Sequence, residues 1–422
     1  MRKAGYMVDK KLAKVVREAY ETVPVYIRNC EKLEIDMKEI LKQKKWEDIP
    51  ILERNQIISE ETSVMAPSAV PLLMTNKLIF ARTSGSTGKY MEIWWKKEDY
   101  NKSMLPLWYY RKKYYGISPE DKMCYFFTIQ NVENEKKSFL RKSELGFSKM
   151  NLTMERLADI WHEMEKFQPK WLMLQPGMAM LLCKCMDKYS LERIESVQYI
   201  EFSGEIFTEA VRQAVREHFG CQMANQYGAN EFNSIAYECP YGNMHLMSEN
   251  VYVEVLNEDK KCVDREEGEV YITSLTNSVM PLIRYRIGDR GKMKTGQKCM
   301  CGNYNPVFQL SSGRADDWII LADGEKIMPN VLIRAFDCVN YRMDGVIKQF
   351  QAVQEDVGQF LIRLAVEEED EYLEQEIEEL FMESLEDERL RSAQYRFFYQ
   401  EELFPDKKTG KLKWFENTIM KN

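Results

Sequence analysis

The sequence predicts an α/β protein with a large N-terminal domain of layered helices and strands and a small C-terminal α+β domain. Between residues 155 and 220, helical and strand-like segments alternate, which is typical of layered α/β domains. After Gly313 the pattern changes to two strand-like runs around a turn, followed by a strongly acidic amphipathic helix. A chain of 422 residues is long enough for two or three domains. We therefore expect an N-terminal domain over 1–313 and a C-terminal domain over 314–422.

The individual elements follow from the spacing of apolar residues, which repeats every three to four positions in helices and every second position in strands. Helices are expected at 8–45 (more than one), 98–118, 157–167, 177–189, 207–219 and 370–385. Strands are expected at 78–81, 171–174, 197–202, 251–256, 268–274, 290–294, 350–352, 359–366 and 395–399.

The composition disfavours several kinds of partner and location. The formal net charge is -8 and the isoelectric point is near 5.4, so neither a nucleic acid nor an anionic membrane is a favoured partner. The N-terminus lacks the apolar core of a signal peptide, and no run approaches the ~18 apolar residues of a membrane span. Ten cysteines are scattered without the spacing of a disulfide scaffold, so we expect thiols in a cytoplasmic protein.

Residues 82–89, Arg-Thr-Ser-Gly-Ser-Thr-Gly-Lys, form a candidate phosphate-binding loop after the strand-like run at 78–81. Backbone N–H groups and hydroxyls can surround phosphate oxygens, and two glycines let the backbone approach closely. Thr83 and Tyr90 stand where a Walker A motif needs a glycine and a hydroxyl residue, so the loop is not of that type. Ordinary turns share this composition. The candidate contacts are Ser84, Gly85, Ser86, Thr87, Gly88 and Lys89.

A second signal, independent of the loop, indicates a metal. Cys239 and His245 have five residues between them, and Cys299 and Cys301 form a Cys-Met-Cys-Gly turn later in the chain. Three thiolates and one imidazole make a closed tetrahedral zinc site, which is structural because no position is left for water or substrate. The single residue between Cys299 and Cys301 is a tight but feasible spacing. The alternative is four unrelated residues.

Six segments in a fixed order make the chain resemble the adenylate-forming superfamily and, within it, the phenylacetate–CoA ligase family. They are RTSGSTGK at 82–89, SGE at 203–205, YGANE at 227–231, MPLIRYRIGD at 280–289, SGRADD at 312–317 and TGKLK at 409–413. Together they run over nearly the whole chain. The resemblance implies a large domain that binds ATP and an acid, a small mobile C-terminal domain, and a homodimer. Tyr90 departs from the family, which usually has a proline after the loop lysine.

The YGANE segment supplies groups suited to a nucleotide. Tyr227 offers a flat face on which a nucleobase could stack, and Glu231 offers a carboxylate that can hold Mg²⁺ against a phosphate. Taken alone, they could equally be a loop tyrosine and a surface glutamate. The resemblance assigns Tyr227, with Gly228, to the adenine site and Glu231 to the magnesium ion.

Further contacts are implied along the chain. A carboxylate accepts two hydrogen bonds at once, so Asp289 suits the paired hydroxyls of a ribose, although a turn Asp often caps a strand end. Gly204 and Glu205 match a family segment beside the nucleotide. The resemblance makes Arg314 a ribose or phosphate contact and Asp316 the hinge between domains; the alternative is a polar linker.

Lys411 is the catalytic lysine that the resemblance implies. By composition it is one member of a basic run that also holds Lys407, Lys408 and Lys413, and the residues alone do not distinguish among them. The matching lysine of the family reaches the carboxylate and the α-phosphate. A point ammonium on a flexible stem suits a phosphorus centre that gains negative charge.

The function expected from the resemblance is activation of a carboxylic acid by ATP and Mg²⁺ through an acyl-adenylate, followed by thioester formation with CoA. An aryl or arylacetic acid is expected, and an aromatic stretch could line its pocket or equally fill a core: Trp108, Tyr109, Tyr110, Phe126 and Phe127. Two alternatives stay open. The enzyme could load an aryl or amino acid onto the pantetheine arm of a carrier protein, or the chain could be a non-catalytic nucleotide-binding homologue.

Overall fold

The computed structural model describes residues 2–59, 61–83, 91–127, 138–149, 152–314, 318–327, 329–343, 346–366, 371–385, 387–404 and 413–419. The chain divides into two compact units. Unit 1 comprises residues 1–116 and 226–311, and unit 2 comprises residues 117–225 and 312–422. The chain crosses from unit 1 to unit 2 for the last time between residues 311 and 312, close to the expected domain boundary after residue 313. A division into domains at residue 313 stays a prediction.

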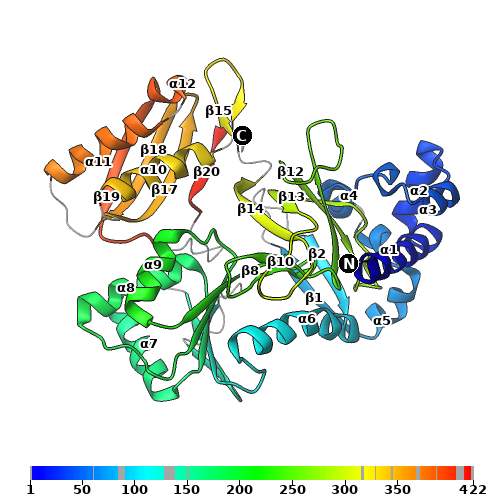
Figure 1. The fold of residues 1–422 in the computed structure, drawn as a ribbon, viewed down its shortest axis with the longest axis horizontal. Coiled ribbons are helices and arrows are strands. Elements are labelled where there is room, and N and C mark those ends of the chain that lie inside the picture. The colour runs from blue at the N-terminus through cyan, green and yellow to red at the C-terminus, as the bar shows by residue number, and fades with distance from the viewer. Residues whose placement is uncertain are drawn as a thin grey trace. The chain divides into compact units, whose positions relative to one another are not determined.

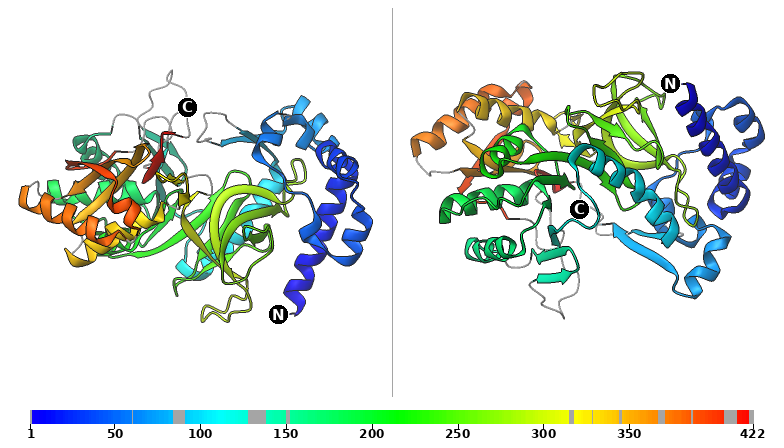
Figure 2. Two further views of the ribbon diagram at one scale, coloured as in Figure 1. Left: turned by 90° about the horizontal axis from the view of Figure 1, so that it is seen from above. Right: turned by 60° about the horizontal axis from the view of Figure 1, so that its bottom comes forward.

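Unit 1 begins with three helices that lie side by side (blue in Figures 1 and 2): α1 (Arg2–Thr22), α2 (Pro24–Leu33) and α3 (Met37–Gln43). The Asp36 carboxylate accepts hydrogen bonds from the backbone N–H groups of Lys38 and Glu39 and so caps α3. Leu12 and Val16 of α1 are buried in the main core of the unit. The remaining helices are α4 (Arg54–Ser59), α5 (Val70–Met74) and α6 (Lys97–Tyr115), with 3-10 turns at Trp46–Asp48, Glu61–Val64 and Pro67–Ala69.

Most strands of unit 1 follow one another in a sheet with the order β11-β12-β13-β14-β10-β9-β8. They are β8 (Gln222–Ala229, which begins in unit 2), β9 (Asn233–Glu238), β10 (Met244–Leu246), β11 (Val251–Leu256), β12 (Glu267–Ser274), β13 (Tyr285–Lys294) and β14 (Val307–Arg314, which ends in unit 2). A separate antiparallel pair joins β1 (Leu78–Thr83) to β2 (Met91–Lys96). The β8–β9 hairpin and β13 carry two of the family motifs.

Unit 2 contains a layered α/β part. Its strands are β3 (Met123–Phe127), β4 (Ser138–Arg141), β5 (Glu144–Ser148), β6 (Trp171–Leu174) and β7 (Tyr199–Ser203), in the order β7-β6-β3-β5-β4. Parallel pairing joins β7 to β6, β6 to β3 and β3 to β5. The helices are α7 (Met154–Phe167), α8 (Pro176–Tyr189) and α9 (Glu209–Phe219). Parallel strands buried under helices are typical of α/β domains.

The C-terminal part of unit 2 holds a four-stranded sheet in the order β19-β18-β17-β20 (Figure 1). Phe336, Phe350 and Phe381 pack their rings at 4.4 and 4.6 Å and so join two helices to the sheet. The strands are β17 (Ile347–Asp356), β18 (Gln359–Val366), β19 (Gln394–Gln400) and β20 (Phe415–Asn417), and a short pair is formed by β15 (Ile319–Ile320) and β16 (Lys326–Ile327). The helices are α10 (Asn330–Arg342), α11 (Glu371–Ser384) and α12 (Glu388–Arg391).

The expected fold class, a mixed α/β protein, is confirmed. All the segments expected to be helical or extended are so, although β13 and β17 extend further than predicted. The sequence predictions missed helices α4, α5, α10 and α12 and strands β2 to β5, β8 to β10, β14 to β16 and β20. Among the described residues, every helix is too short or too polar to cross a membrane.

Candidate nucleotide site and metal centre

Two motif residues expected to bind the nucleotide meet in unit 1. The hydroxyl of Tyr227, on β8, donates a hydrogen bond of 2.6 Å to Oδ2 of Asp289, on β13. The ring of Tyr227 stacks on Phe308 of β14, with centroids 5.5 Å apart and planes 15° apart. A nucleobase would therefore have to stack on the opposite face of Tyr227. The long-range pairing of strands brings together residues that are far apart in sequence.

Glu231 lies at the tip of the β8–β9 hairpin and is only 6% exposed. A β-bulge between Tyr227 and Gly228 shapes the strand that leads to it. A Cβ atom on Gly228 would lie 2.5 Å from the carbonyl oxygen of Asn233, so only glycine fits there. A buried carboxylate at a fixed position suits a hard cation such as Mg²⁺, which prefers oxygen ligands.

The motif at 280–289 also contributes a structural ion pair. Nε of Arg284 donates to Oε2 of Glu254 at 3.0 Å, and both side chains are buried. Another guanidinium nitrogen of Arg284 donates to the carbonyl oxygens of Glu47 and Ile49. Arg284 thus ties the motif segment to the 3-10 turn at Trp46–Asp48 and to the residue that follows it, while Asp289 further along the segment lies beside Tyr227.

Glu205 and Gly204 belong to unit 2. Oε2 of Glu205 accepts a hydrogen bond of 2.8 Å from the backbone N–H of Gly177, in the first turn of α8. Because the N-cap residue Gln175 makes no side-chain cap, the Glu205 carboxylate satisfies an N–H group that the helix leaves unpaired. Gly204 has a φ of 86°. Their expected role beside the nucleotide stays a prediction.

Several expected site residues fall outside this description. The loop residues 84–89, the hinge residue Asp316 and Lys411 lie outside the described residues. Arg314 is the last residue of β14, and only its backbone is described. Their roles remain those that the resemblance implies.

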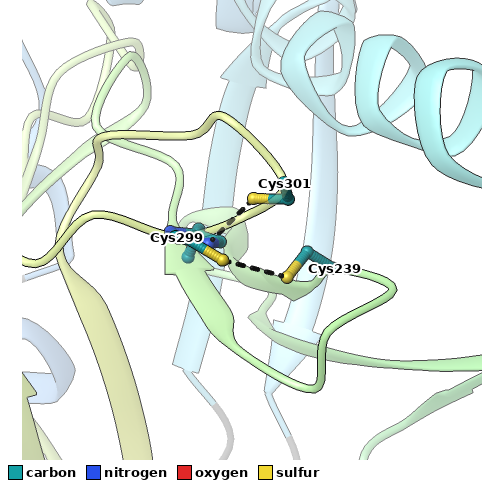
Figure 3. Close-up of side chains that lie close together, drawn as sticks. Cys239, Cys299 and Cys301 are labelled. Atoms are coloured by element: carbon teal, nitrogen blue, oxygen red, sulfur yellow. Dashed lines mark hydrogen bonds between the residues drawn. The ribbon is translucent and has the colours of Figure 1, made fainter.

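The cysteines and histidine expected to bind metal come together in unit 1 (Figure 3). The ligand atoms of Cys239, His245, Cys299 and Cys301 all lie within 4.8 Å of one another. The Sγ atoms of Cys239 and Cys299 are 3.7 Å apart, and Sγ of Cys301 is 3.3 Å from Nε2 of His245. In Figure 3 the three thiols point toward one another.

This geometry fits a tetrahedral zinc ion. Zinc holds thiolate sulfurs at about 2.3 Å, so two sulfurs on one tetrahedron are roughly 3.8 Å apart. Nδ1 of His245 lies 3.0 Å from the carbonyl oxygen of Asn305, which selects the tautomer that leaves Nε2 free to bind a metal. Burial lowers the pKa of His245, so the ring is neutral at pH 7, as a ligand must be. Burial raises the pKa of Cys239 to about 12, so a thiolate there needs a cation to offset it.

Polar groups around the cluster donate to its sulfur atoms. The backbone N–H of Asn303 donates to Sγ of Cys301 at 3.3 Å, and the hydroxyl of Tyr114 donates to the same atom at 3.5 Å. Nδ2 of Asn243 donates to Sγ of Cys299 at 3.5 Å. The sequence reading missed these groups, since a tyrosine 187 positions from its cysteine gives no local signal.

The aromatic stretch considered for the acid pocket divides between two surroundings. Tyr110 stacks on Tyr114 at 5.3 Å, which places it beside the cysteine cluster, and Tyr109 is 59% exposed. Phe126 packs on Phe147 at 5.7 Å, against the core of unit 2. Packing of this kind is typical of core residues, and an acid pocket lined by this stretch stays a prediction.

A scan against family models finds a match to the AMP-binding enzyme family over residues 20–281, more than half of the chain. The chain belongs to this family. The predicted membership of the adenylate-forming superfamily is thereby confirmed. The match covers the candidate phosphate loop, the β8–β9 hairpin and Cys239 with His245.

Curated relatives are phenylacetate-coenzyme A ligases and one protein named CapK. The chain is 22% identical to the Escherichia coli phenylacetate-coenzyme A ligase over 76% of its own length and 74% of the relative. It is 27% identical to the Thermus thermophilus phenylacetate-coenzyme A ligase over 45% of its own length, but spans only 43% of that relative. It is 24% identical to Protein CapK of Staphylococcus aureus over 69% of its length and 64% of the relative.

Solved structures share the fold. A 2-hydroxyisobutyryl-CoA ligase in complex with its acyl-AMP superposes with a TM-score of 0.77, covering 98% of this chain and 90% of that one at 17% identity. An anthranilate CoA ligase in complex with anthranoyl-AMP gives a TM-score of 0.56, covering 79% of this chain and 65% of that one at 16% identity. The fold of this chain is therefore that of structures solved with acyl-adenylates.

Proposed function

We propose that this protein is an AMP-forming acid–thiol ligase. A carboxylate oxygen of the acid attacks the α-phosphorus of ATP, the bond to the bridging oxygen breaks, and pyrophosphate leaves. The sulfur of CoA then attacks the acyl carbon, loses its proton, and expels AMP with the former carboxylate oxygen. The observation that supports this proposal best is the Tyr227–Asp289 contact, together with the buried Glu231 at the tip of the hairpin that carries Tyr227, in a chain of the AMP-binding enzyme family.

Each motif residue has a role in this proposal. Tyr227 and Gly228 border the adenine, Asp289 accepts from the ribose hydroxyls, and Glu231 would hold Mg²⁺. When bound, Mg²⁺ neutralises charge on the phosphates. The loop residues 84–89 surround the phosphates, and Gly204 and Glu205 belong to a segment that the resemblance puts beside the nucleotide.

The C-terminal residues act in the first half-reaction. Lys411 places an ammonium beside the oxygens that gain charge, and Arg314 contacts the ribose or a phosphate. Asp316 is the hinge about which the domain 314–422 turns away from the domain 1–313 before the thiol attacks.

An aryl or arylacetic acid and CoA are the proposed substrates, because relatives of this chain are phenylacetate-coenzyme A ligases. A carrier-protein pantetheine arm is the alternative acceptor, since it ends in the same thiol. We also propose a homodimer and a cytoplasmic location. The location is supported by the ten cysteines, none of which forms a disulfide, as is usual in reducing compartments.

We further propose that Cys239, His245, Cys299 and Cys301 hold one structural zinc ion. The sulfur–sulfur distance of 3.7 Å between Cys239 and Cys299 supports this, because it is close to the edge of a zinc–thiolate tetrahedron. Four protein ligands leave no open position, so the ion would stabilise the fold and take no part in the chemistry.

Exchange of labelled pyrophosphate into ATP, measured with a panel of aryl, arylacetic and small aliphatic acids, tests the function. The proposal predicts exchange that depends on both an acid and Mg²⁺, and thioester formation once CoA is added. Binding of ATP without exchange for any acid would instead favour a non-catalytic homologue. Acyl transfer to a carrier protein but not to CoA would select the alternative acceptor.

A further inference from the structure

The carboxylate expected to hold Mg²⁺ lies in a turn that is held unusually firmly. Ala229 pairs with Asn233 across the β8–β9 hairpin, so residues 230–232 form the connection. The N–H of Phe232 donates to the carbonyl oxygen of Ala229 at 3.0 Å, and Asn233 has a φ of 59°, which asparagine tolerates well. Hairpin tips are usually exposed and mobile. Here Glu231 and Phe232 are both buried.

Two side chains from outside the hairpin hold its tip. Nε1 of Trp95, on β2, donates to the carbonyl oxygen of Asn230 at 3.2 Å. Nδ2 of Asn233 donates to Oγ of Ser103, on α6, at 2.6 Å. Trp95 and Ser103 are 1% and 0% exposed. The bond from Trp95 therefore holds the residue before Glu231, and the bond to Ser103 holds Asn233, two residues after it.

The Ser103 hydroxyl is itself fixed. It donates to the carbonyl oxygen of Tyr100 at 2.7 Å, which turns its lone pairs toward Asn233. The backbone carbonyl oxygen of Ser103 accepts a bond of 2.6 Å from Nδ2 of Asn250, a buried residue. The serine is therefore a rigid point of attachment between α6 and the hairpin.

We propose that Ser103 and Trp95 are positioning residues that hold the Glu231 carboxylate in place for the magnesium ion of ATP. This inference rests on the function proposed above. A carboxylate on a free tip would have to be ordered each time the nucleotide bound, and small displacements of a catalytic group reduce rates strongly. Ser103 and Trp95 lie outside all six family segments, so the resemblance does not assign this role.

Ser103→Ala is the first test, because it removes one acceptor and alanine favours the helix. Loss of one hydrogen bond to the tip predicts a rise of about three- to tenfold in the Mg²⁺ concentration for half-maximal pyrophosphate exchange. Conversion of a supplied acyl-adenylate and thiol to thioester should not change. Trp95→Phe keeps the buried ring, removes the N–H, and should act in the same direction.

A second measurement does not depend on turnover. The melting temperature should rise more with ATP and Mg²⁺ than with ATP and a chelator, and this difference should shrink in both variants. Thr22→Ala is the matched control, since its hydroxyl also bonds a helix carbonyl, that of Glu18, far along the chain from the hairpin. Thr22→Ala should leave both measurements unchanged.

A double variant isolates the bond. Asn233→Gly keeps the left-handed backbone and removes the side-chain amide. Because Asn233→Gly and Ser103→Ala remove the same hydrogen bond, the double variant should need no more Mg²⁺ than the more affected single variant. The inference is overturned if Ser103→Ala and Trp95→Phe change neither the Mg²⁺ concentration for half-maximal exchange nor the rise in melting temperature that ATP and Mg²⁺ produce. A fall in the melting temperature of the ligand-free variants alone would be such a result, since it shows only a structural role. If the wild-type protein shows no pyrophosphate exchange with any of the acids, the proposed function is contradicted instead. The melting measurement then still decides whether Ser103 and Trp95 are positioning residues.

Discussion

The cysteine–histidine cluster and the β8–β9 hairpin both lie in unit 1, yet the first draws four candidate ligand side chains together and the second holds one buried carboxylate at a turn. All four candidate zinc ligands are described, and their ligand atoms converge within 4.8 Å. The nucleotide motifs bring together Tyr227 and Asp289, with Glu231 at the hairpin tip, while Glu205 caps a helix in unit 2. The loop residues 84–89, Asp316 and Lys411 lie outside the described residues, and only the backbone of Arg314 is described.

This difference follows from what each region must do. A structural metal site needs a single arrangement, and hydrogen bonds from Asn243 and Asn303 hold its sulfurs in that arrangement. A magnesium ion held against a nucleotide would take most of its ligands from phosphates and water, so one protein carboxylate in a fixed position suffices. The hydrogen bonds of Trp95 with Asn230 and of Asn233 with Ser103 hold the turn on either side of Glu231.

The largest effect is expected from the cluster. Cys301→Ser should abolish binding of about one zinc per chain and lower the melting temperature by roughly 10 °C, because metal binding contributes directly to folding. Metal analysis and calorimetry on the same samples measure both. Cys262→Ser, at an exposed thiol outside the cluster, should change neither. Wild-type protein without zinc, and with a melting temperature that a chelator does not alter, would remove the metal from the account.

Lys411→Ala should separate the two half-reactions. Losing one charge at the transition state costs about 3–4 kcal/mol, so pyrophosphate release should fall ~10²–10³-fold. Conversion of a supplied acyl-adenylate to thioester should continue at a near-normal rate. Lys413→Ala is the control and should cost little. Equal slowing of both steps by Lys411→Ala, or loss of adenylation in Lys413→Ala, would assign the role elsewhere.

Glu231→Gln tests the hairpin directly. The amide keeps the shape of the side chain but removes the charge that would hold Mg²⁺, so adenylate formation should fall by about two orders of magnitude. ATP affinity should fall only moderately, since Tyr227 and Asp289 are untouched. Pyrophosphate exchange and calorimetric titration with ATP measure the two quantities. Near-normal exchange would exclude Glu231 from the metal site.

The smallest effect is expected at Glu269 of β12, which pairs with β13, the strand that carries Asp289. Burial opposes ionisation of Glu269, but hydrogen bonds from Arg286, Lys260 and Tyr271 outweigh it and lower the pKa of Glu269 to about 2. Because the folded pKa is depressed, this stabilisation is complete above about pH 4.3 and is lost as pH falls toward 2. Glu269→Gln should cost about 1–3 kcal/mol at pH 7. Denaturant unfolding should show that loss shrinking toward zero near pH 2; an equal loss at both pH values would refute the mechanism.

The sequence was most informative where a pattern is local. Apolar spacing located α7, α8 and β6 closely, and the cysteine spacing identified a cluster that the fold then brought together. Sequence spacing gives no sign of contacts such as that of Ser103 with Asn233, 130 positions away. The capping role of Glu205 was missed for the same reason, since its partner Gly177 is on another element.

Transfer of an oxygen isotope tests the central claim most directly. An acid labelled with ¹⁸O in its carboxylate should give AMP that carries one ¹⁸O atom on its phosphate, because the carboxylate oxygen bonds to the α-phosphorus and stays there when the thiol displaces AMP. Mass spectrometry of the nucleotide products, with ATP, Mg²⁺ and CoA present, measures this. The account predicts singly labelled AMP in proportion to thioester. Thioester formation with unlabelled AMP, or with ADP and labelled phosphate, would contradict an acyl-adenylate.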